Sequence, residues 1–233
     1  MTKICALIPS YNVAKTIGPI VRELRSRDLD VLVVDDGSTD STSLTAGKSG
    51  AAVLRNEVNC GKGASLRRGF QYVVDKGYDA AVTIDGDGQH LPEDVEKFLK
   101  AQTLNPEAGL IIGNRMQCPA GMPLSRLLTN RVMSGFISRL CRQHIPDSQN
   151  GFRLIKSRIL KALKLKSSRF EIESEIILEA AKMGAQIISI PISAVYKGHP
   201  SSISPLLDTV RFIRFSLPYL GFCNRSQGNG SKG

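Results

Sequence analysis

The stretch Val82-Thr83-Ile84-Asp85-Gly86-Asp87-Gly88-Gln89-His90 is an apolar run that ends in two carboxylates one residue apart. Alternate residues of an extended segment point the same way, so Asp85 and Asp87 can offer two hard oxygens to one Mg²⁺ or Mn²⁺. Water and phosphate oxygens would complete the coordination of such an ion. The letters Asp-Gly-Asp-Gly are also typical of an ordinary turn. The stretch therefore predicts the end of a buried strand, followed by a metal site or a plain turn.

Short apolar runs alternate with helical patterns on both sides of this stretch. Such alternation predicts an α/β fold with a mostly parallel, doubly wound sheet flanked by helices. In an open sheet of this kind, ligands bind beyond the carboxyl ends of the strands. We expect strands near 3–8, 31–34, 51–54, 80–84, 110–113, 152–155, 186–190 and 193–196, and helices near 14–26, 40–48, 62–75, 92–103, 123–142, 172–183 and 206–217.

The composition indicates one α/β domain, which we expect to span residues 1–223, with a Gly/Ser-rich disordered tail at 224–233. Five scattered cysteines without a CxxC pair predict neither a disulfide framework nor a zinc cluster, as is typical of a reducing compartment. The first residues form a strand-like run rather than a leader, and no apolar stretch reaches the roughly 18 residues that span a bilayer. We expect a cytoplasmic chain, soluble or at most peripheral on a membrane.

The formal net charge of +10 indicates an anionic partner. Nucleic acid, anionic lipid and phosphorylated ligands are all attracted to so basic a surface. The basic residues concentrate after about residue 115, but no RNA-recognition motif, zinc finger or helix-turn-helix pattern accompanies them. We therefore expect a phosphorylated ligand or a membrane surface, and no nucleic acid.

Two earlier strand ends also carry polar motifs. The first is Pro9-Ser10-Tyr11-Asn12, whose aromatic ring can stack on a base. The second is Asp35-Asp36-Gly37-Ser38-Thr39-Asp40, whose carboxylates suit hydrogen bonds to a base or ribose. Helix capping alone would also explain Ser38 and Asp40. With the carboxylates of the opening stretch, three strand ends of the same predicted sheet supply polar groups to one edge.

Taken together, these segments resemble the family 2 glycosyltransferases of GT-A fold, and the resemblance extends from Ile4 to about Leu217. Within that family, the Asp-x-Asp-x-Gln-His form and the later Gly-Phe-Arg are most similar to the dolichyl-phosphate mannose synthase branch, which moves a sugar to a polyprenyl phosphate. The resemblance is carried by Ile8-Pro9-Ser10-Tyr11-Asn12, Val33-Val34-Asp35-Asp36-Gly37-Ser38-Thr39-Asp40, Asn59-Cys60-Gly61-Lys62-Gly63, Asp85-Gly86-Asp87-Gly88-Gln89-His90, Gly113-Asn114-Arg115 and Asp147-Ser148-Gln149-Asn150-Gly151-Phe152-Arg153.

The resemblance implies a role for each motif. Residues 1–115 would form the nucleotide-sugar-binding half and residues 116–223 the acceptor-binding half. The ion would neutralise the leaving diphosphate, and two arginines would clamp an acceptor phosphate, which suits guanidinium forks. The implied site consists of Pro9, Tyr11, Asn12 and Asp36 at the nucleoside, Val34 at the base pocket, Gly86 and Lys197 at the diphosphate, Asp85, Asp87 and Gln89 at Mg²⁺ or Mn²⁺, and Arg115 and Arg126 at the acceptor.

The implied function is metal-dependent, inverting transfer of mannose or glucose from GDP- or UDP-hexose to dolichyl or undecaprenyl phosphate, at the cytoplasmic face of a membrane. The chain would reach the lipid through the basic helix at 123–142, through the apolar side of the last helix, or through a membrane-anchored partner subunit. Two alternatives stay open. One is a hydroxyl acceptor, for which Asp147 is the candidate base, and the other is a non-catalytic nucleotide-sugar-binding subunit.

Two other enzyme classes fit the sequence less well. A nucleotidyltransferase should open with a Gly-rich, Arg-containing first loop, and Pro9-Ser10-Tyr11-Asn12 is not such a loop. An NAD-dependent oxidoreductase should carry Gly-x-Gly-x-x-Gly after the first strand, and Gly61-Lys62-Gly63 follows a later strand.

Overall fold

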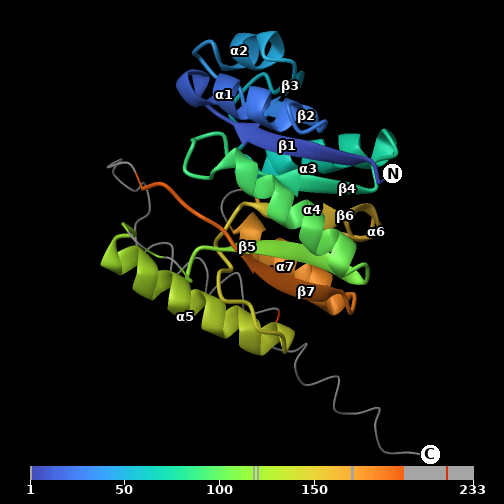
Figure 1. The fold of residues 1–233 in the computed structure, drawn as a ribbon, viewed down its shortest axis with the longest axis vertical. Helices are drawn as coiled ribbons and strands as arrows, with labels where there is room; N and C mark the ends of the chain where they lie inside the picture. The colour runs from blue at the N-terminus through green and yellow to red at the C-terminus, as the bar shows by residue number, and fades with distance from the viewer. Residues whose placement is uncertain (1, 118, 120, 169–170, 197–218, 220–233) are drawn as a thin grey trace, which may run out of the picture.

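The computed structural model of the chain describes residues 2–117, 119, 121–168, 171–196 and 219 (Figure 1). The strands are β1 (Ile4–Ser10), β2 (Asp30–Asp35), β3 (Ala52–Arg55), β4 (Ala80–Thr83), β5 (Ala108–Asn114), β6 (Arg153–Lys156) and β7 (Gln186–Pro191). The helices are α1 (Ala14–Arg25), α2 (Thr42–Lys48), α3 (Lys62–Asp75), the 3₁₀ turn η1 (Pro92–Asp94), α4 (Val95–Leu104), α5 (Leu124–Cys141), α6 (Ser157–Leu160) and α7 (Ile172–Lys182).

The seven strands form one mixed sheet in the order β3-β2-β1-β4-β6-β5-β7 (Figure 1). All neighbouring pairs are parallel except those of β6, which runs antiparallel to both β4 and β5. Helices cover both faces of the sheet. The predicted α/β, mostly parallel, doubly wound architecture is therefore confirmed.

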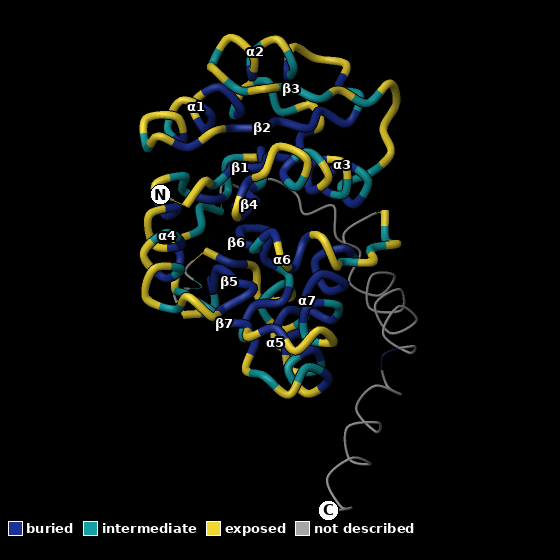
Figure 2. The backbone as a smooth tube through the Cα atoms, turned by 90° about the vertical axis from the view of Figure 1, so that its right-hand side faces the viewer, coloured by how far each residue is buried: buried dark blue, intermediate teal, exposed yellow. Residues whose placement is uncertain are grey.

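Alternation along the strands sends side chains into two cores. In β1, Leu7 packs on one face of the sheet and Ile8 on the other, as expected for a strand buried on both sides. The core on the Leu7 side is closed by α3, α5, α6 and α7, and the core on the Ile8 side by α1, α2 and α4. In Figure 1, α4 accordingly lies in front of the sheet and α7 behind it. Figure 2 shows the inner strands of the sheet in dark blue, as buried backbone, whereas the edge strand β3 is exposed or half-buried.

The strand order reverses between β1 and β4. From β1 the chain adds β2 and β3 on one side, and then crosses back to place β4 on the other side. A reversal of this kind opens a crevice at the carboxyl ends of the two strands, where ligands of open α/β sheets bind. The loops after β1, β2 and β4 meet at this edge, and antiparallel β6 brings the residues before its own first residue to the same edge.

Most predicted elements are present, but the strand predicted at 193–196 is wrong. Pro191 ends β7, and the chain then leaves β5 and crosses to the loop after β4. There Ala194 makes a single antiparallel bridge with His90. The short helix α6 was not predicted. The helix predicted at 206–217 and the tail at 224–233 lie outside the described residues. Within the part of the chain that the structure describes, no helix is long and apolar enough to cross a bilayer.

Candidate active site

The loop Asp85–His90 follows β4 and lies at the strand-order reversal; we refer to it as the metal loop. Asp87 is exposed, and its Oδ1 accepts a hydrogen bond of 2.9 Å from the backbone N–H of Gln89. Gly86 is buried against the end of β1, where an added Cβ would lie 2.9 Å from Oγ of Ser10. The hydroxyl of Thr16 donates to the carbonyl oxygen of Gly86. The loop therefore packs closely on β1 and leaves the Asp87 carboxylate in solvent.

Asp85 is held by two cationic or polar neighbours. Nζ of Lys62 lies 2.5 Å from Oδ1 of Asp85, and Nε2 of His90 lies 3.7 Å from Oδ2. Burial would raise the pKa of Asp85, but Lys62 and His90 keep it well below its usual range. The ring of His90 packs on Phe152, with centroids 5.5 Å apart. The two neighbours therefore favour the ionised form of Asp85 and fix its orientation.

The residues predicted at the nucleoside lie on the loops after β1 and β2. Tyr11 is 46% exposed, so its ring is available for stacking. Asn12 joins the two loops, because its Oδ1 accepts from the backbone N–H of Thr39 and its own N–H donates to Oγ of Ser38, both at 2.9 Å. Asn12 takes a positive φ of 52°, a conformation that asparagine tolerates better than most residues. Asn12 thus fixes the loop that presents Tyr11.

Asp36 and Val34, which were predicted at the nucleoside and the base pocket, are both buried. Asp36 Oδ1 accepts from the side chain of Asn56 and from the N–H of Cys60, and Oδ2 accepts from the N–H of Gly61 at 2.7 Å. These bonds fix the loop that leads into α3. Val34 is fully buried in the core on the α3 side, and its register partner Pro9 is buried as well. Asp36, Val34 and Pro9 therefore form the floor beneath the Tyr11 loop.

Arg115 and Asp147 form a buried pair at the end of β5. Nε of Arg115 lies 2.8 Å from Oδ2 of Asp147 and Nη2 lies 2.9 Å from Oδ1, and Asn130 of α5 donates to the same carboxylate at 2.7 Å. Burial would raise the pKa of Asp147, but Arg115 and Asn130 hold it below its ordinary value. Asp147 is consequently an anchor for Arg115 and for the loop before β6.

Arg126 reaches from the first turn of α5 to the metal loop. Its Nη1 lies 3.4 Å from Oε1 of Gln89, and its guanidinium lies 5.6 Å from the ring centroid of Tyr196. Burial lowers the pKa of Arg126, and the positive charge of Arg115 lowers it further. Among the described residues, no carboxylate forms an ion pair with Arg126. Two guanidinium groups thus lie close together, and only Arg115 is neutralised by a carboxylate.

The segment after β7 is fastened to the metal loop. Val195 donates its N–H to the carbonyl oxygen of Gln89 at 2.9 Å, and Ser193 donates to Oδ2 of Asp94 at 2.8 Å. These bonds bring Tyr196 beside Arg126. Lys197, predicted at the diphosphate, lies outside the described residues.

Three residues of the site had been assigned no functional role from the sequence alone. Lys62 stands inside a motif that carries the family resemblance, but no role had been given to it. Glu173 lies in an acidic run that is typical of a solvent-exposed helix, yet it is buried and lies 2.7 Å from Nζ of Lys62. Tyr196 follows the last strand and carries no motif. Only Lys62 had a sequence signal that could have found it.

The donor set of the metal loop suits a magnesium-type ion. Asp85, Asp87 and Gln89 offer oxygen atoms, which hard cations prefer. Within the described residues, no group of three or more His, Cys, Asp or Glu side chains could hold a metal ion by itself. A dication would thus need further oxygens from water or from a phosphorylated ligand, as is usual where Mg²⁺ binds with a nucleotide.

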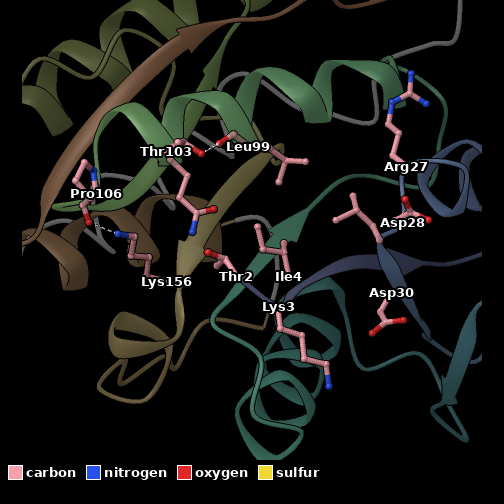
Figure 3. Close-up of a pocket in the computed structure, with 12 residues that line it drawn as sticks. Thr2, Lys3, Ile4, Arg27, Asp28, Asp30, Leu99, Thr103, Pro106 and Lys156 are labelled. Carbon is pink, nitrogen blue, oxygen red and sulfur yellow. Dashed lines mark hydrogen bonds between the residues drawn. The ribbon is translucent and has the colours of Figure 1, made fainter.

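A large hollow in the surface lies away from this edge. It measures about 820 Å³ and is lined by residues at the starts of β1 and β2, near the end of β6 and on α4 (Figure 3). Figure 3 shows Lys3, Asp30 and Lys156 around it. These residues lie at the opposite end of the strands from the metal loop. The hollow is therefore separate from the candidate active site.

Comparison with known proteins gives matches over most of the chain. Residues 5–164 match the family described as "Glycosyl transferase family 2". The chain is 30% identical over 213 residues to the UDP-N-acetylglucosamine–dolichyl-phosphate N-acetylglucosaminyltransferase of Methanococcus voltae, a match that covers 82% of this chain and 84% of the relative. It is 29% identical over 207 residues to the undecaprenyl-phosphate mannosyltransferase of Micrococcus luteus, covering 83% and 84% of the two chains.

Solved structures share the fold. The glucosyl-3-phosphoglycerate synthase of Mycobacterium tuberculosis, in complex with Mn²⁺, uridine diphosphate and phosphoglyceric acid, superposes with a TM-score of 0.71. The superposition covers 96% of this chain and 79% of that one, at 19% sequence identity. At that identity, the likeness establishes the GT-A architecture alone.

Proposed function

Because the chain belongs to glycosyl transferase family 2 and is a glycosyltransferase, we propose that it transfers a hexose from a nucleotide diphosphate sugar to a polyprenyl phosphate, with the help of a divalent metal. Relatives named for dolichyl-phosphate and undecaprenyl-phosphate transfer support this acceptor. Mannose or glucose is the proposed sugar, and GDP or UDP its carrier.

The observation that carries the proposal is the position of Arg126. Its guanidinium touches the metal loop at Gln89, lies near Arg115 and has no carboxylate partner among the described residues. A phosphate bound there would meet charge-assisted hydrogen bonds and would lie beside a donor held on the metal loop. The proposed division of the chain follows, with the nucleotide sugar bound by residues 1–115 and the acceptor by residues 116–223.

On the donor side, Tyr11 and Asn12 would bind the nucleoside above Asp36, Val34 and Pro9. Gly86 would lie beside the diphosphate, and Lys197 would supply a further positive charge. Asp85, Asp87 and Gln89 would hold Mg²⁺ or Mn²⁺, and such an ion would supply positive charge to offset the negative charge of the leaving diphosphate.

The proposed reaction is a single displacement. A phosphate oxygen of the acceptor forms the new bond to the anomeric carbon while the bond from that carbon to the diphosphate oxygen breaks. The nucleoside diphosphate leaves with the electron pair, and the configuration inverts. A phosphate monoester is already anionic near neutral pH, so this attack needs no strong base. Arg115 and Arg126 would orient the attacking phosphate.

A hydroxyl acceptor would need a general base, and Asp147 is the candidate in the neighbourhood. Asp147 is fully buried and bonded to Arg115 and Asn130, and its pKa is lowered. A carboxylate with these partners is a poor proton acceptor. The anchoring role of Asp147 therefore favours the phosphate acceptor over the hydroxyl.

The outer face of α5 fits a peripheral membrane surface. Leu124, Leu128 and Val132 are spaced by four residues and are 69%, 53% and 72% exposed. Exposed Arg131 lies beside this row. A helix face with apolar side chains next to basic ones suits an anionic lipid surface. The row begins in the same turn as Arg126, so contact with the cytoplasmic face of a membrane would bring a lipid phosphate to the site.

The test is a transfer assay with the purified chain. UDP- and GDP-linked glucose and mannose are offered with Mn²⁺ or Mg²⁺, and either undecaprenyl phosphate or a hydroxyl glycolipid serves as acceptor. We expect one nucleotide sugar to give a sugar-phosphate-lipid product that disappears with EDTA. Sugar appearing only on the hydroxyl acceptor would overturn the proposed acceptor. A need for an added membrane protein would instead favour a membrane-anchored partner subunit.

A further inference from the structure

Four charged side chains of alternating sign run from the core to the metal loop; we name this row, Arg153, Glu173, Lys62 and Asp85, the charge chain. Nη2 of Arg153 lies 3.1 Å from Oε2 of Glu173, Nζ of Lys62 lies 2.7 Å from Oε1 of Glu173, and the same Nζ lies 2.5 Å from Oδ1 of Asp85. Arg153 is fully buried and Glu173 nearly so. The chain therefore links a proposed metal ligand to fixed charges in the core.

The inner end of the charge chain is rigid. Arg153 donates hydrogen bonds to the carbonyl oxygens of Asn150, Ser148 and Glu173 and forms an ion pair with the Glu173 carboxylate. The backbone of Gly151 lies close against the outer end, where an added Cβ would lie 2.7 Å from Oδ2 of Asp85 and 2.9 Å from Nζ of Lys62. Lys62 is thus held between two carboxylates, that of Glu173 on the core side and that of Asp85 on the metal loop.

The location of Lys62 is unfavourable for α3 itself. Lys62 is the first residue of that helix, where the positive end of the helix dipole disfavours a cation. The carboxylate of Asp36 already accepts from the N–H groups of Cys60 and Gly61 at this terminus. The contacts of Lys62 with Asp85 and Glu173 explain its place better than helix stability does.

We propose that Lys62 is a positioning residue that holds Oδ1 of Asp85 and opposes the binding of a dication that arrives without a diphosphate. This inference rests on the proposed role of Asp85 as a metal ligand. The ammonium group and a dication compete for the same carboxylate oxygen, and they repel each other. A nucleotide diphosphate brings negative charge that offsets this repulsion, so metal and donor sugar are bound together. Lys62 thereby couples metal affinity to the presence of the donor.

The test is titration of the full chain with Mn²⁺ alone, followed by the electron paramagnetic resonance signal of free Mn²⁺. In Lys62→Met, we expect Mn²⁺ to bind about tenfold more tightly than in the unmodified chain, the effect of removing one repelling charge a few ångströms away in a solvated site. Lys62→Arg keeps the charge and should bind Mn²⁺ as the unmodified chain does. Lys62→Gln provides a second neutral variant if Lys62→Met does not fold. Equal or weaker binding in a folded neutral variant would overturn the proposal.

A double variant separates two explanations of tighter binding. In Lys62→Met with Glu173→Gln, the net charge returns to its original value, and Glu173 is no longer a carboxylate. Binding that stays tighter than in the unmodified chain means that Lys62 acts on Asp85 directly, as proposed. A return to the original affinity means that the gain came from the unpaired charge of Glu173, as a ligand or at a distance, and not from the release of Asp85, which contradicts the proposal.

Failure of the metal site itself gives a different result. Adding Asp87→Ala to Lys62→Met should remove the gained affinity. Mn²⁺ that still binds tightly without Asp87 would show that the ion lies elsewhere, and the metal part of the proposed function would then fail. Two results together support the metal site and the positioning role of Lys62: loss of the tighter Mn²⁺ binding when Asp87→Ala is added, and unchanged Mn²⁺ binding in Lys62→Arg.

Discussion

Arg115 and Asp147 lie opposite each other so that two guanidinium N–H groups and the backbone N–H of Arg115 all point to one carboxylate. Both side chains are buried, so neither charge has water as an alternative partner. Breaking a buried pair by removing one charge typically costs about 3–5 kcal/mol. The pair therefore fixes the end of β5 to the loop that precedes β6.

We expect this pair to make stability depend on pH in the acid range. The folded pKa of Asp147 is lowered, so its contribution is complete above the unfolded pKa of about 3.9 and is lost as pH falls through the folded pKa. Asp147→Asn should lower the free energy of unfolding by about 3 kcal/mol near neutral pH. This difference in stability between the variant and the unmodified chain should become smaller as the pH is lowered. Urea unfolding at a series of pH values measures this. Asp75→Asn, at an exposed position, is the control. A stability difference between Asp147→Asn and the unmodified chain that did not change with pH would contradict the expectation.

Gly151→Ala should impair the site more than the fold. The added methyl group would meet Asp85 and Lys62 at 2.7–2.9 Å, and overpacking of this kind costs about 1–3 kcal/mol. We expect at least a tenfold loss of transfer, since the proposed metal ligand must move. The matched control is Gly135→Ala in α5, where a Cβ meets nothing within 4 Å and helix propensity should stabilise the chain by up to about 1 kcal/mol. Equal activity in both variants would argue against a fixed Asp85.

Asp87→Ala should abolish transfer without lowering the melting temperature. The side chain is exposed, and its one described hydrogen bond is to the N–H of Gln89, so its loss removes little folding energy. Thermal unfolding, with and without Mn²⁺ and the accepted nucleotide sugar, checks both points. The stabilisation by ligands seen in the unmodified chain should disappear. Full activity in Asp87→Ala would rule out its role as a metal ligand.

Arg126→Ala should raise the KM for the lipid acceptor by about 10- to 100-fold, the equivalent of one or two charge-assisted hydrogen bonds. Binding of the nucleotide sugar should change less, because the one hydrogen bond described between Arg126 and the metal loop is a long contact of 3.4 Å with the amide oxygen of Gln89. Lys100→Ala, which removes an exposed cation from α4, is the control. A loss of donor affinity in Arg126→Ala would show that the division between donor and acceptor sides is wrong.

Replacing Leu128 and Val132 together by Asp should weaken binding to vesicles that contain anionic phospholipid. Two exposed apolar side chains would be lost from the outer face of α5 and two like charges added. Cosedimentation with the vesicles measures the effect. Transfer to a short-chain, water-soluble polyprenyl phosphate should persist. Leu104→Asp, equally exposed on α4, should leave vesicle binding unchanged, and a similar loss there would point to a non-specific charge effect.

The parts of the fold that follow local rules could be predicted. The runs that form β1 and β4 are bounded by turn residues, and the motifs after them locate the metal loop and the Tyr11 loop. Strand direction is not a local property. The run Arg153-Leu154-Ile155-Lys156 predicts a strand, but its antiparallel insertion between β4 and β5 depends on tertiary packing.

Buried charges of the site could not be predicted for a similar reason. Glu173 and Glu175 are charged residues of the kind that usually lies on the solvated surface of a helix, yet both are nearly fully buried. Their partners come from distant segments: Lys62 and Arg153 for Glu173, and the backbone N–H groups of Lys166 and Ser167 for Glu175. Helical periodicity measures hydrophobicity along one element and carries no information about such partners.

The residues of the charge chain are far apart in the sequence, so they are synthesised at different times during translation. Asp85 is made early in translation, but its supports at Gly151 and Glu173 are made much later. Domains generally fold as units, and the sheet that carries the metal loop is completed by strands made after β4. A nascent chain halted before α7 would also lack Glu173, and Lys62 would be left against Asp85 alone. Catalytic competence would thus require the chain through α7, long after the metal loop itself has been made.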